Sequence, residues 1–268
     1  MKYQIVIGAF LASTTLLWGQ EAPVPPPPAT PPPSATMPAP VAPAAPDRAQ
    51  SKAIASMQAK LNDWPQLDRF REENATLPPP APGEQRVVFF GDSITDNWGR
   101  HYGDFFPGKP YINRGISGQT TPQMLVRFEQ DVVHLNPAAV VILAGTNDVA
   151  GNTGPSTPQM IEDNFVSMAE IAKASNIKMI IASITPAAAY PWKPGIQPVA
   201  EIRQLNDWLR DFCARQGLVY LDYYSAMANP DGSMKDGISI GDGVHPNAQG
   251  YAIMAPLAEK AIAQALRR

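Results

Sequence analysis

The sequence has 268 residues and a formal net charge of −3. This length accommodates one sizeable domain with additional segments, and the charge excludes the basic surface typical of nucleic-acid-binding proteins. We therefore expect no nucleic-acid partner. The only cysteine, Cys213, excludes a disulfide within the chain.

Residues 1–20 have the pattern of a secretory signal peptide. Lys2 precedes an apolar stretch from Ile5 to Trp18, which is short for a transmembrane span. We expect cleavage and export to the periplasm or the medium of a bacterial cell, with no transmembrane segment afterwards; an uncleaved anchor is the alternative. Cys213 lies too far downstream to carry the lipid of a bacterial lipoprotein.

Residues 21–46 are rich in proline and alanine. Proline lacks a backbone donor and fixes its own dihedral angle, so this segment is predicted to form neither helix nor sheet. A polyproline-type spacer has a reach of about 3.1 Å per residue. Two interpretations remain open, namely a tether that holds the domain away from a membrane or wall and an inert disordered arm.

Residues 47–84 are predicted to be a helical support segment. Ile54, Met57 and Leu61 recur at helical spacing, and Trp64-Pro65 ends that helix. A second short helical stretch contains Leu67 and Phe70. We expect this segment to pack against the main domain.

From residue 85 to residue 268, apolar runs alternate with helical patterns. Strands are expected at 87–90, 111–112, 139–143, 179–182 and 218–221, and helices at 121–135, 157–171, 202–212 and 248–266. Strands that are apolar throughout are typical of parallel sheets buried on both faces. Threonine followed by proline at 121 and 157 predicts two of the helix starts. The alternation predicts an α/β fold, a three-layer α/β/α sandwich with a parallel five-stranded sheet.

Polar segments follow the first three strands and precede the last helix. Ser93 follows the first strand, Gly118 the second and Asn147 the third. Asp242 and His245 lie shortly before the terminal helix. Because open parallel sheets bind ligands at the carboxyl ends of their strands, we expect these residues to converge.

These residue types suit a serine hydrolase. Ser93 can act as nucleophile, His245 as its base, and Asp242 as the acid that orients the base. The backbone N–H groups of Ser93 and Gly118 and the amide of Asn147 could hold the oxyanion. Each segment alone could be an ordinary turn, since glycine, aspartate and serine are turn formers. The combination of all four indicates catalysis.

The choice of base is narrow because the sequence has three histidines. His134 lies near the end of a predicted helix, where histidine commonly interacts with the helix dipole. His101 lies in a polar, aromatic loop with only Asp104 as a nearby acid. Only His245 combines an aspartate at short spacing with a position before a terminal helix.

The motifs resemble those of the GDSL-type, or SGNH, hydrolases. The matching segments are Gly91-Asp92-Ser93-Ile94-Thr95, the segment ending at Gly118, Gly145-Thr146-Asn147-Asp148 and Asp242-Gly243-Val244-His245-Pro246. The resemblance implies a flavodoxin-like sandwich, no metal, no organic cofactor, and an oxyanion hole completed by Gly118 and Asn147. Within the family, the chain is similar to bacterial esterases that resemble platelet-activating-factor acetylhydrolases and lysophospholipases.

We expect an exported esterase that cleaves short acyl esters, especially O-acetyl esters, of small molecules or glycans. No long apolar lid segment is visible in the sequence, and Trp98, Tyr190 and Trp192 are candidate substrate-binding residues. Asp92, Asp96 and Asp148 are expected to be structural hydrogen-bond acceptors. The alternatives are a lysophospholipase or lipase, an acyltransferase, and a noncatalytic carbohydrate-binding module.

Overall fold

The computed structural model describes residues 47–267. The predicted signal peptide, residues 1–20, and the predicted spacer, residues 21–46, lie outside the described residues. Residues from Asp47 onward belong to one compact unit.

The core of this unit is a parallel sheet of five strands in the order β2-β1-β3-β4-β5. The strands are β1 (Val87–Gly91), β2 (Tyr111–Gly115), β3 (Ala139–Leu143), β4 (Lys178–Ala182) and β5 (Val219–Leu221). Every residue of β1 and β3 is buried, as the unbroken apolar runs predicted. Gly91 at the end of β1 pairs with Gly115 and Leu143, so the carboxyl ends of the three neighbouring strands are aligned.

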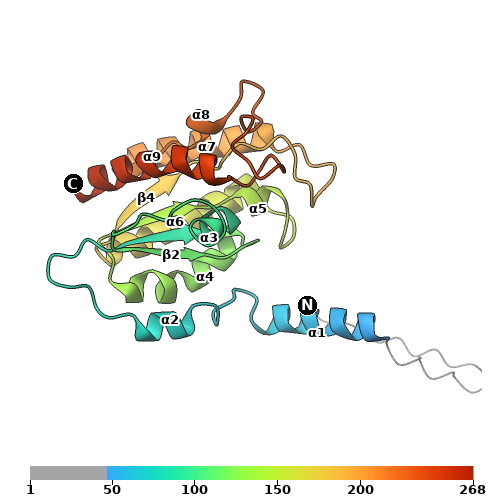
Figure 1. Cartoon of the computed structure of the whole chain (residues 1–268), viewed down its shortest axis with the longest axis horizontal. Coiled ribbons are helices and arrows are strands. Elements are labelled where there is room, and N and C mark those ends of the chain that lie inside the picture. The colour runs from blue at the N-terminus through green and yellow to red at the C-terminus, as the bar shows by residue number, and fades with distance from the viewer. Residues whose placement is uncertain (1–46, 268) are drawn as a thin grey trace, which may run out of the picture. The chain divides into compact units, whose positions relative to one another are not determined.

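Helices cover both faces of the sheet. Alternate strand residues such as Val88 and Phe90 pack in one hydrophobic cluster, under α4 (Thr121–Asp131), α6 (Pro158–Ala174) and α7 (Val199–Gln216). Val87 and Phe89 point the other way, toward α3 (Ser93–Asn97), α8 (Tyr224–Met227) and α9 (Ala248–Leu266). Figure 1 shows α4 and α9 on opposite sides of the strands. The predicted three-layer, flavodoxin-like sandwich is confirmed.

The helix starts follow the predicted threonine–proline pattern with one shift. Thr157 caps α6, and its hydroxyl accepts from the N–H of Met160. Helix α4 begins at Thr121 as expected, but its cap is Thr120, which forms a capping box with Gln123. The helix predicted to run to residue 135 ends at Asp131 and continues as a short 3-10 turn, η1 (Val133–Leu135). A further short helix, α5 (Thr146–Val149), follows β3.

The first helix, α1 (Arg48–Asn62), forms as the sequence predicts, but its apolar side chains do not pack against the domain. Ile54, Met57 and Leu61 are 46%, 64% and 79% exposed, respectively. The expectation that this helix packs against the domain is therefore wrong. Helical spacing places the three side chains on one face, but it does not supply an opposing surface.

Residues 64–76 make the contacts instead. Phe70 is fully buried, with the guanidinium of Arg114 4.6 Å from its ring centre. In α2 (Arg71–Thr76), the side chain of Asn74 donates to the carboxylate of Asp131 at 2.7 Å. Three glutamine side chains also donate to backbone carbonyls of residues 64–67, and these are Gln119, Gln123 and Gln130. This short stretch supports α4 and the loop before it.

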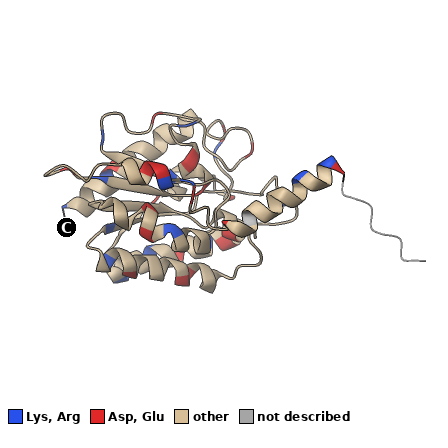
Figure 2. Cartoon of the chain, turned by 90° about the horizontal axis from the view of Figure 1, so that it is seen from below, with Lys and Arg blue, Asp and Glu red and all other residues tan. Residues whose placement is uncertain are grey.

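The described surface carries both signs of charge. Figure 2 shows acidic and basic residues interspersed along the helices. Among residues 47–267, no helix is long and apolar enough to cross a membrane.

Candidate active site

The predicted site residues lie where the chain changes direction across the sheet. From β1 the chain passes to β2 on one side and then returns to β3 on the other. Such a switch point opens a crevice at the carboxyl end of the first strand, where ligands bind in open α/β sheets. Ser93 begins α3 at the end of β1.

The turn that carries Ser93 requires the residues that precede it. A Cβ on Gly91 would lie 2.1 Å from the Thr95 hydroxyl and 2.7 Å from the Leu143 carbonyl oxygen, so only glycine fits there. Asp92 caps α3, and its carboxylate accepts from the N–H of Ile94 at 2.9 Å. Strand and helix therefore meet in a tight turn that places Ser93 in the cleft.

The structure brings the three predicted triad residues together. The Ser93 hydroxyl lies 2.8 Å from Nε2 of His245. Nδ1 of the same ring lies 2.6 Å from Oδ2 of Asp242. Oδ1 of Asp242 accepts from the backbone N–H groups of Val244 at 3.0 Å and His245 at 2.9 Å. The aspartate is thus fixed by its own turn and aligned with the imidazole.

The hydrogen bonds keep Asp242 ionised. Partial burial raises the pKa of this carboxyl, but donation from the His245 ring and from the two backbone N–H groups outweighs it and lowers the pKa. A carboxylate in contact with Nδ1 stabilises an imidazolium, which forms when Nε2 takes a proton from a serine.

The three predicted oxyanion donors border the same cleft. Within residues 47–267, the backbone N–H groups of Ser93 and Gly118 have no hydrogen-bond acceptor. Gly118 has a φ of +80°, a conformation that favours glycine, in the loop after β2. Nδ2 of Asn147 donates to the Gln119 carbonyl at 3.0 Å and lies 3.3 Å from Oδ2 of Asp92.

The three aspartates expected to accept structural hydrogen bonds do so. Asp92 caps α3, Asp96 accepts from both the N–H and the hydroxyl of Ser117, and Asp148 accepts from the N–H and the hydroxyl of Thr121. Burial raises the pKa of Asp92 to about 7 and that of Asp148 to about 6. These bonds hold the loops after β1, β2 and β3 in place.

Of the three aromatic residues predicted to bind substrate, one lines the cleft and two are buried. Trp192 lines the cleft, and its ring centre lies 5.8 Å from that of His245. Trp98 does not line the cleft, because the residue is 2% exposed and its ring stacks on Tyr251 within the core beneath α3. Tyr190 is 1% exposed and lies behind Trp192. The predicted substrate contacts of Trp98 and Tyr190 are therefore wrong.

Several cleft residues were missed from the sequence. The cleft has a volume of about 470 Å³, and the unpredicted side chains that line it are Asn97, His101, Tyr102, Ser117, Asn152 and Ile240. His101, which was not predicted to be the catalytic base, lines the wall of the cleft. Asn152 donates to Oδ1 of Asn147 at 2.6 Å, and because it lies in a loop, no sequence pattern could have identified it.

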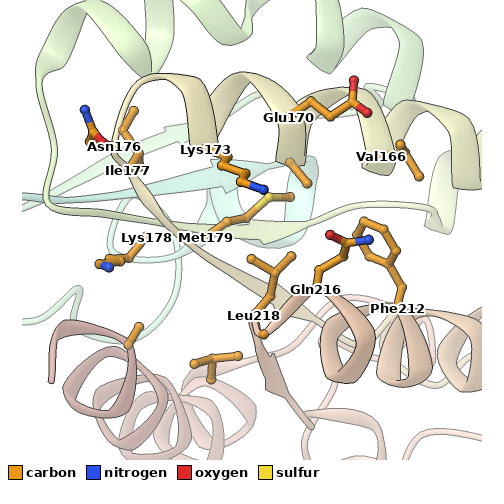
Figure 3. Close-up of a pocket in the computed structure, with 14 residues that line it drawn as sticks. Val166, Glu170, Lys173, Asn176, Ile177, Lys178, Met179, Phe212, Gln216 and Leu218 are labelled. Atoms are coloured by element: carbon orange, nitrogen blue, oxygen red, sulfur yellow. The ribbon is translucent and has the colours of Figure 1, made fainter. Parts of the chain in front are cut away.

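A second hollow of about 470 Å³ lies at the other end of the strands, away from the Ser93 cleft. It is bounded by the amino ends of β4 and β5 and by the last turns of α6 and α7 (Figure 3). Lys173, Lys178 and Glu170 provide its charges, and no serine, cysteine or histidine lines it. Within residues 47–267, no group of three or more histidine, cysteine, aspartate or glutamate side chains could hold a metal ion. Of these two hollows, the Ser93 cleft is the one lined by serine and histidine side chains.

The fold defines the class of protein as a flavodoxin-like α/β hydrolase. The model of the GDSL-like lipase/acylhydrolase family matches residues 89–253. The chain belongs to this family and is an ester-cleaving hydrolase, so the predicted resemblance is confirmed.

Three known proteins illustrate the similarity. A GDSL-like lipase from Bacteroides thetaiotaomicron VPI-5482 is 43% identical, with a TM-score of 0.72 over 75% of this chain and 98% of that one. The uncharacterized lipoprotein YqeF of Bacillus subtilis (strain 168) is 28% identical over 186 residues, which are 56% of this chain and 75% of YqeF. Axe2, an acetylxylan esterase from Geobacillus stearothermophilus, is 20% identical, with a TM-score of 0.53 over 66% of this chain and 94% of that one. At that identity, Axe2 shows the shared fold alone.

Proposed function

We propose that this chain is an exported serine carboxylesterase that removes short acyl groups, especially O-acetyl groups, from small molecules or glycans. Ser93, His245 and Asp242 form its catalytic triad. The observation that carries the proposal is the continuous hydrogen-bonded series of the three side chains, with contacts of 2.8 Å and 2.6 Å.

The reaction is a two-step acyl transfer. His245 takes the hydroxyl proton of Ser93 as the serine oxygen attacks the ester carbonyl, and the imidazolium then gives that proton to the departing alcohol. Water, deprotonated by the same imidazole, next attacks the acyl-enzyme, and the carboxylic acid and free Ser93 are released. Asp242 holds the ring and stabilises its positive charge in both steps.

The negative charge on the carbonyl oxygen needs donors that are already in place. The N–H groups of Ser93 and Gly118, which have no acceptor within residues 47–267, are available for it. The amide of Asn147 is the third donor. Its 3.3 Å contact with Asp92 is long enough for an oxyanion to compete for that hydrogen.

The walls of the cleft favour a short acyl group on a polar alcohol. Most lining side chains are polar, and Trp192, Tyr102 and Ile240 are the large apolar or aromatic ones. A long acyl chain would find a single aliphatic side chain, Ile240, in this lining, whereas an acetyl group needs little apolar surface. Trp192 is 38% exposed and offers a ring face on which a sugar could stack.

Export is supported by the signal-like pattern of residues 1–20 and by the lipoprotein name of the relative YqeF. The single cysteine here lies in α7 and is buried, so it is unsuited to carry a lipid. We propose export to the periplasm or the medium without a lipid on this residue.

The test is turnover of p-nitrophenyl esters from acetyl to palmitoyl by residues 47–268, with Ser93→Ala as the control. We expect turnover to be highest at acetyl, to fall beyond butyryl, and to drop in the control by a factor on the order of 10⁴ or more with an unchanged melting temperature. Turnover retained by Ser93→Ala would refute the triad. A maximum at long chains would favour a lipase or lysophospholipase, and a folded but inactive protein would favour an acyltransferase or a binding module.

A further inference from the structure

Three hydrogen bonds run in series from the wall of the cleft to the proposed oxyanion hole. The indole N–H of Trp192 donates to Oδ1 of Asn152 at 3.1 Å. Nδ2 of Asn152 donates to Oδ1 of Asn147 at 2.6 Å. Nδ2 of Asn147 in turn donates to the Gln119 carbonyl at 3.0 Å. The loop after β4 is thereby joined to the loop after β3.

The donors and acceptors in this series can be arranged in only one way. An indole nitrogen can donate but cannot accept, so the oxygen of the Asn152 amide must face Trp192 and its NH₂ group must face Asn147. The oxygen of Asn147 is then engaged by Asn152, and its NH₂ group is turned toward Gln119 and Asp92, beside Ser93. We propose that Trp192 and Asn152 are positioning residues that set the direction of the Asn147 amide for the oxyanion hole. This inference rests on the proposed function.

The direction of the amide decides whether Asn147 helps or hinders the reaction. With its NH₂ group toward the cleft, the amide donates to the charge that develops on the carbonyl oxygen. Rotated by half a turn, it would present its own oxygen, which would repel that charge. The Gln119 carbonyl favours the donating orientation, because it accepts from the NH₂ group of Asn147. Asn152 disfavours the rotated orientation, because it donates to Oδ1 of Asn147 on the side away from Gln119.

Trp192 also places the first member of the series at the surface of the cleft. The residue is 38% exposed and lines the cleft, and the centre of its ring lies 5.8 Å from that of His245. Lys193 approaches the Gly151 carbonyl at 3.5 Å, a second link between the same two loops. A group that packs on Trp192 would therefore steady the amide that stabilises the transition state. Binding energy gained there should appear in kcat rather than only in KM.

The test is a double-mutant cycle with p-nitrophenyl acetate as the probe. Asn147→Ala should lower kcat by about 10²–10³-fold, and Asn152→Ala by roughly tenfold with KM nearly unchanged. If Asn152 acts through Asn147, the double variant should be no slower than Asn147→Ala alone. Trp192→Phe, which keeps a ring but removes the N–H donor, should lower kcat by several-fold. Trp208→Phe in α7, stacked on Phe212, is its matched control and should not change kcat.

The outcomes separate the two proposals. Losses of kcat that multiply in the double variant, or an Asn152→Ala variant that changes only the melting temperature, would overturn the positioning role while leaving the triad in place. If Asn147→Ala retains full kcat while Ser93→Ala is inactive, the oxyanion role of Asn147 fails, and the positioning role fails with it. If Ser93→Ala is fully active, the proposed function itself fails.

Discussion

Asp92 is a buried carboxyl directly before Ser93, and its protonation is linked to folding. Burial raises its pKa from 3.8 to about 7, although the hydrogen bond from the Ile94 N–H and the charge of His245 lower it in part. In the unfolded chain the same carboxyl ionises near its ordinary pKa. The folded state therefore binds the proton more tightly, and this contribution to stability is lost as the pH rises from 3.8 to about 7.

Replacing Asp92 by Asn removes this titration while keeping the size of the side chain. We expect the free energy of unfolding of Asp92→Asn, relative to the unaltered protein, to increase between about pH 4 and about pH 7 and to level off above. A constant offset is also expected, because the NH₂ group that replaces Oδ2 cannot accept from Asn147. Urea unfolding at a series of pH values measures the difference. An offset that does not change with pH would show that Asp92 titrates alike in the folded and unfolded states.

At the scale of elements, we expect α1 to contribute little to stability and Phe70 to contribute much. Removal of residues 47–62 should change the free energy of unfolding by no more than about 0.5 kcal/mol, because the apolar face of α1 is exposed. Phe70→Ala should lower it by about 3–5 kcal/mol, since the ring is fully buried. Denaturant unfolding of both variants beside residues 47–268 makes the comparison. A large loss of stability on removing α1 would show that this helix is packed in solution.

The same contrast explains which elements could be predicted from the sequence. Strands β1, β3 and β4 were predictable because unbroken apolar runs must be buried on both faces, and helices were the segments available to cover them. The edge strand β2 was predicted at residues 111–112 alone, and it extends to Gly115 through its backbone pairing with β1. The stripe of Ile54, Met57 and Leu61 predicted a helix correctly, but periodicity contains no information about its partner. Packing of that kind depends on surfaces that are distant in the sequence.

In the candidate site too, the sequence predicts some positions and not others. Ser93, Gly118, Asn147, Asp242 and His245 could be predicted to converge because parallel strands align their carboxyl ends, and the structure brings them to one cleft. The direction of an aromatic ring is not fixed in this way. Trp98 lies five residues after Ser93, yet the short helix α3 turns it into the core. Asn152 acts through a side-chain amide in a loop, which has no periodic signal.

At the scale of the whole molecule, Arg127 of α4 connects the parts that carry the site. Its side chain is fully buried. The guanidinium donates to the Gly91 carbonyl at 3.0 Å, at the end of β1, and to the Arg114 carbonyl at 2.9 Å, in β2. It also donates to the side chain of Gln119, beside Gly118, and pairs with the buried Asp131 at 3.1 Å. One cation thus holds together the turn before Ser93 and the loop that contains Gly118.

Arg127→Met should therefore affect both stability and turnover. The variant leaves the buried Asp131 carboxylate without its counter-charge and removes one donor from each of the Gly91 and Arg114 carbonyls. We expect the free energy of unfolding to fall by about 3–5 kcal/mol. Arg210→Ala is the matched control, since its pair with Asp207 is exposed and should contribute less than about 1 kcal/mol. Denaturant unfolding and p-nitrophenyl acetate turnover should be measured on the same samples. If Arg127→Met loses stability but its folded fraction keeps full kcat, the β1 and β2 loops hold the site without the arginine, and Arg127 stabilises the fold alone.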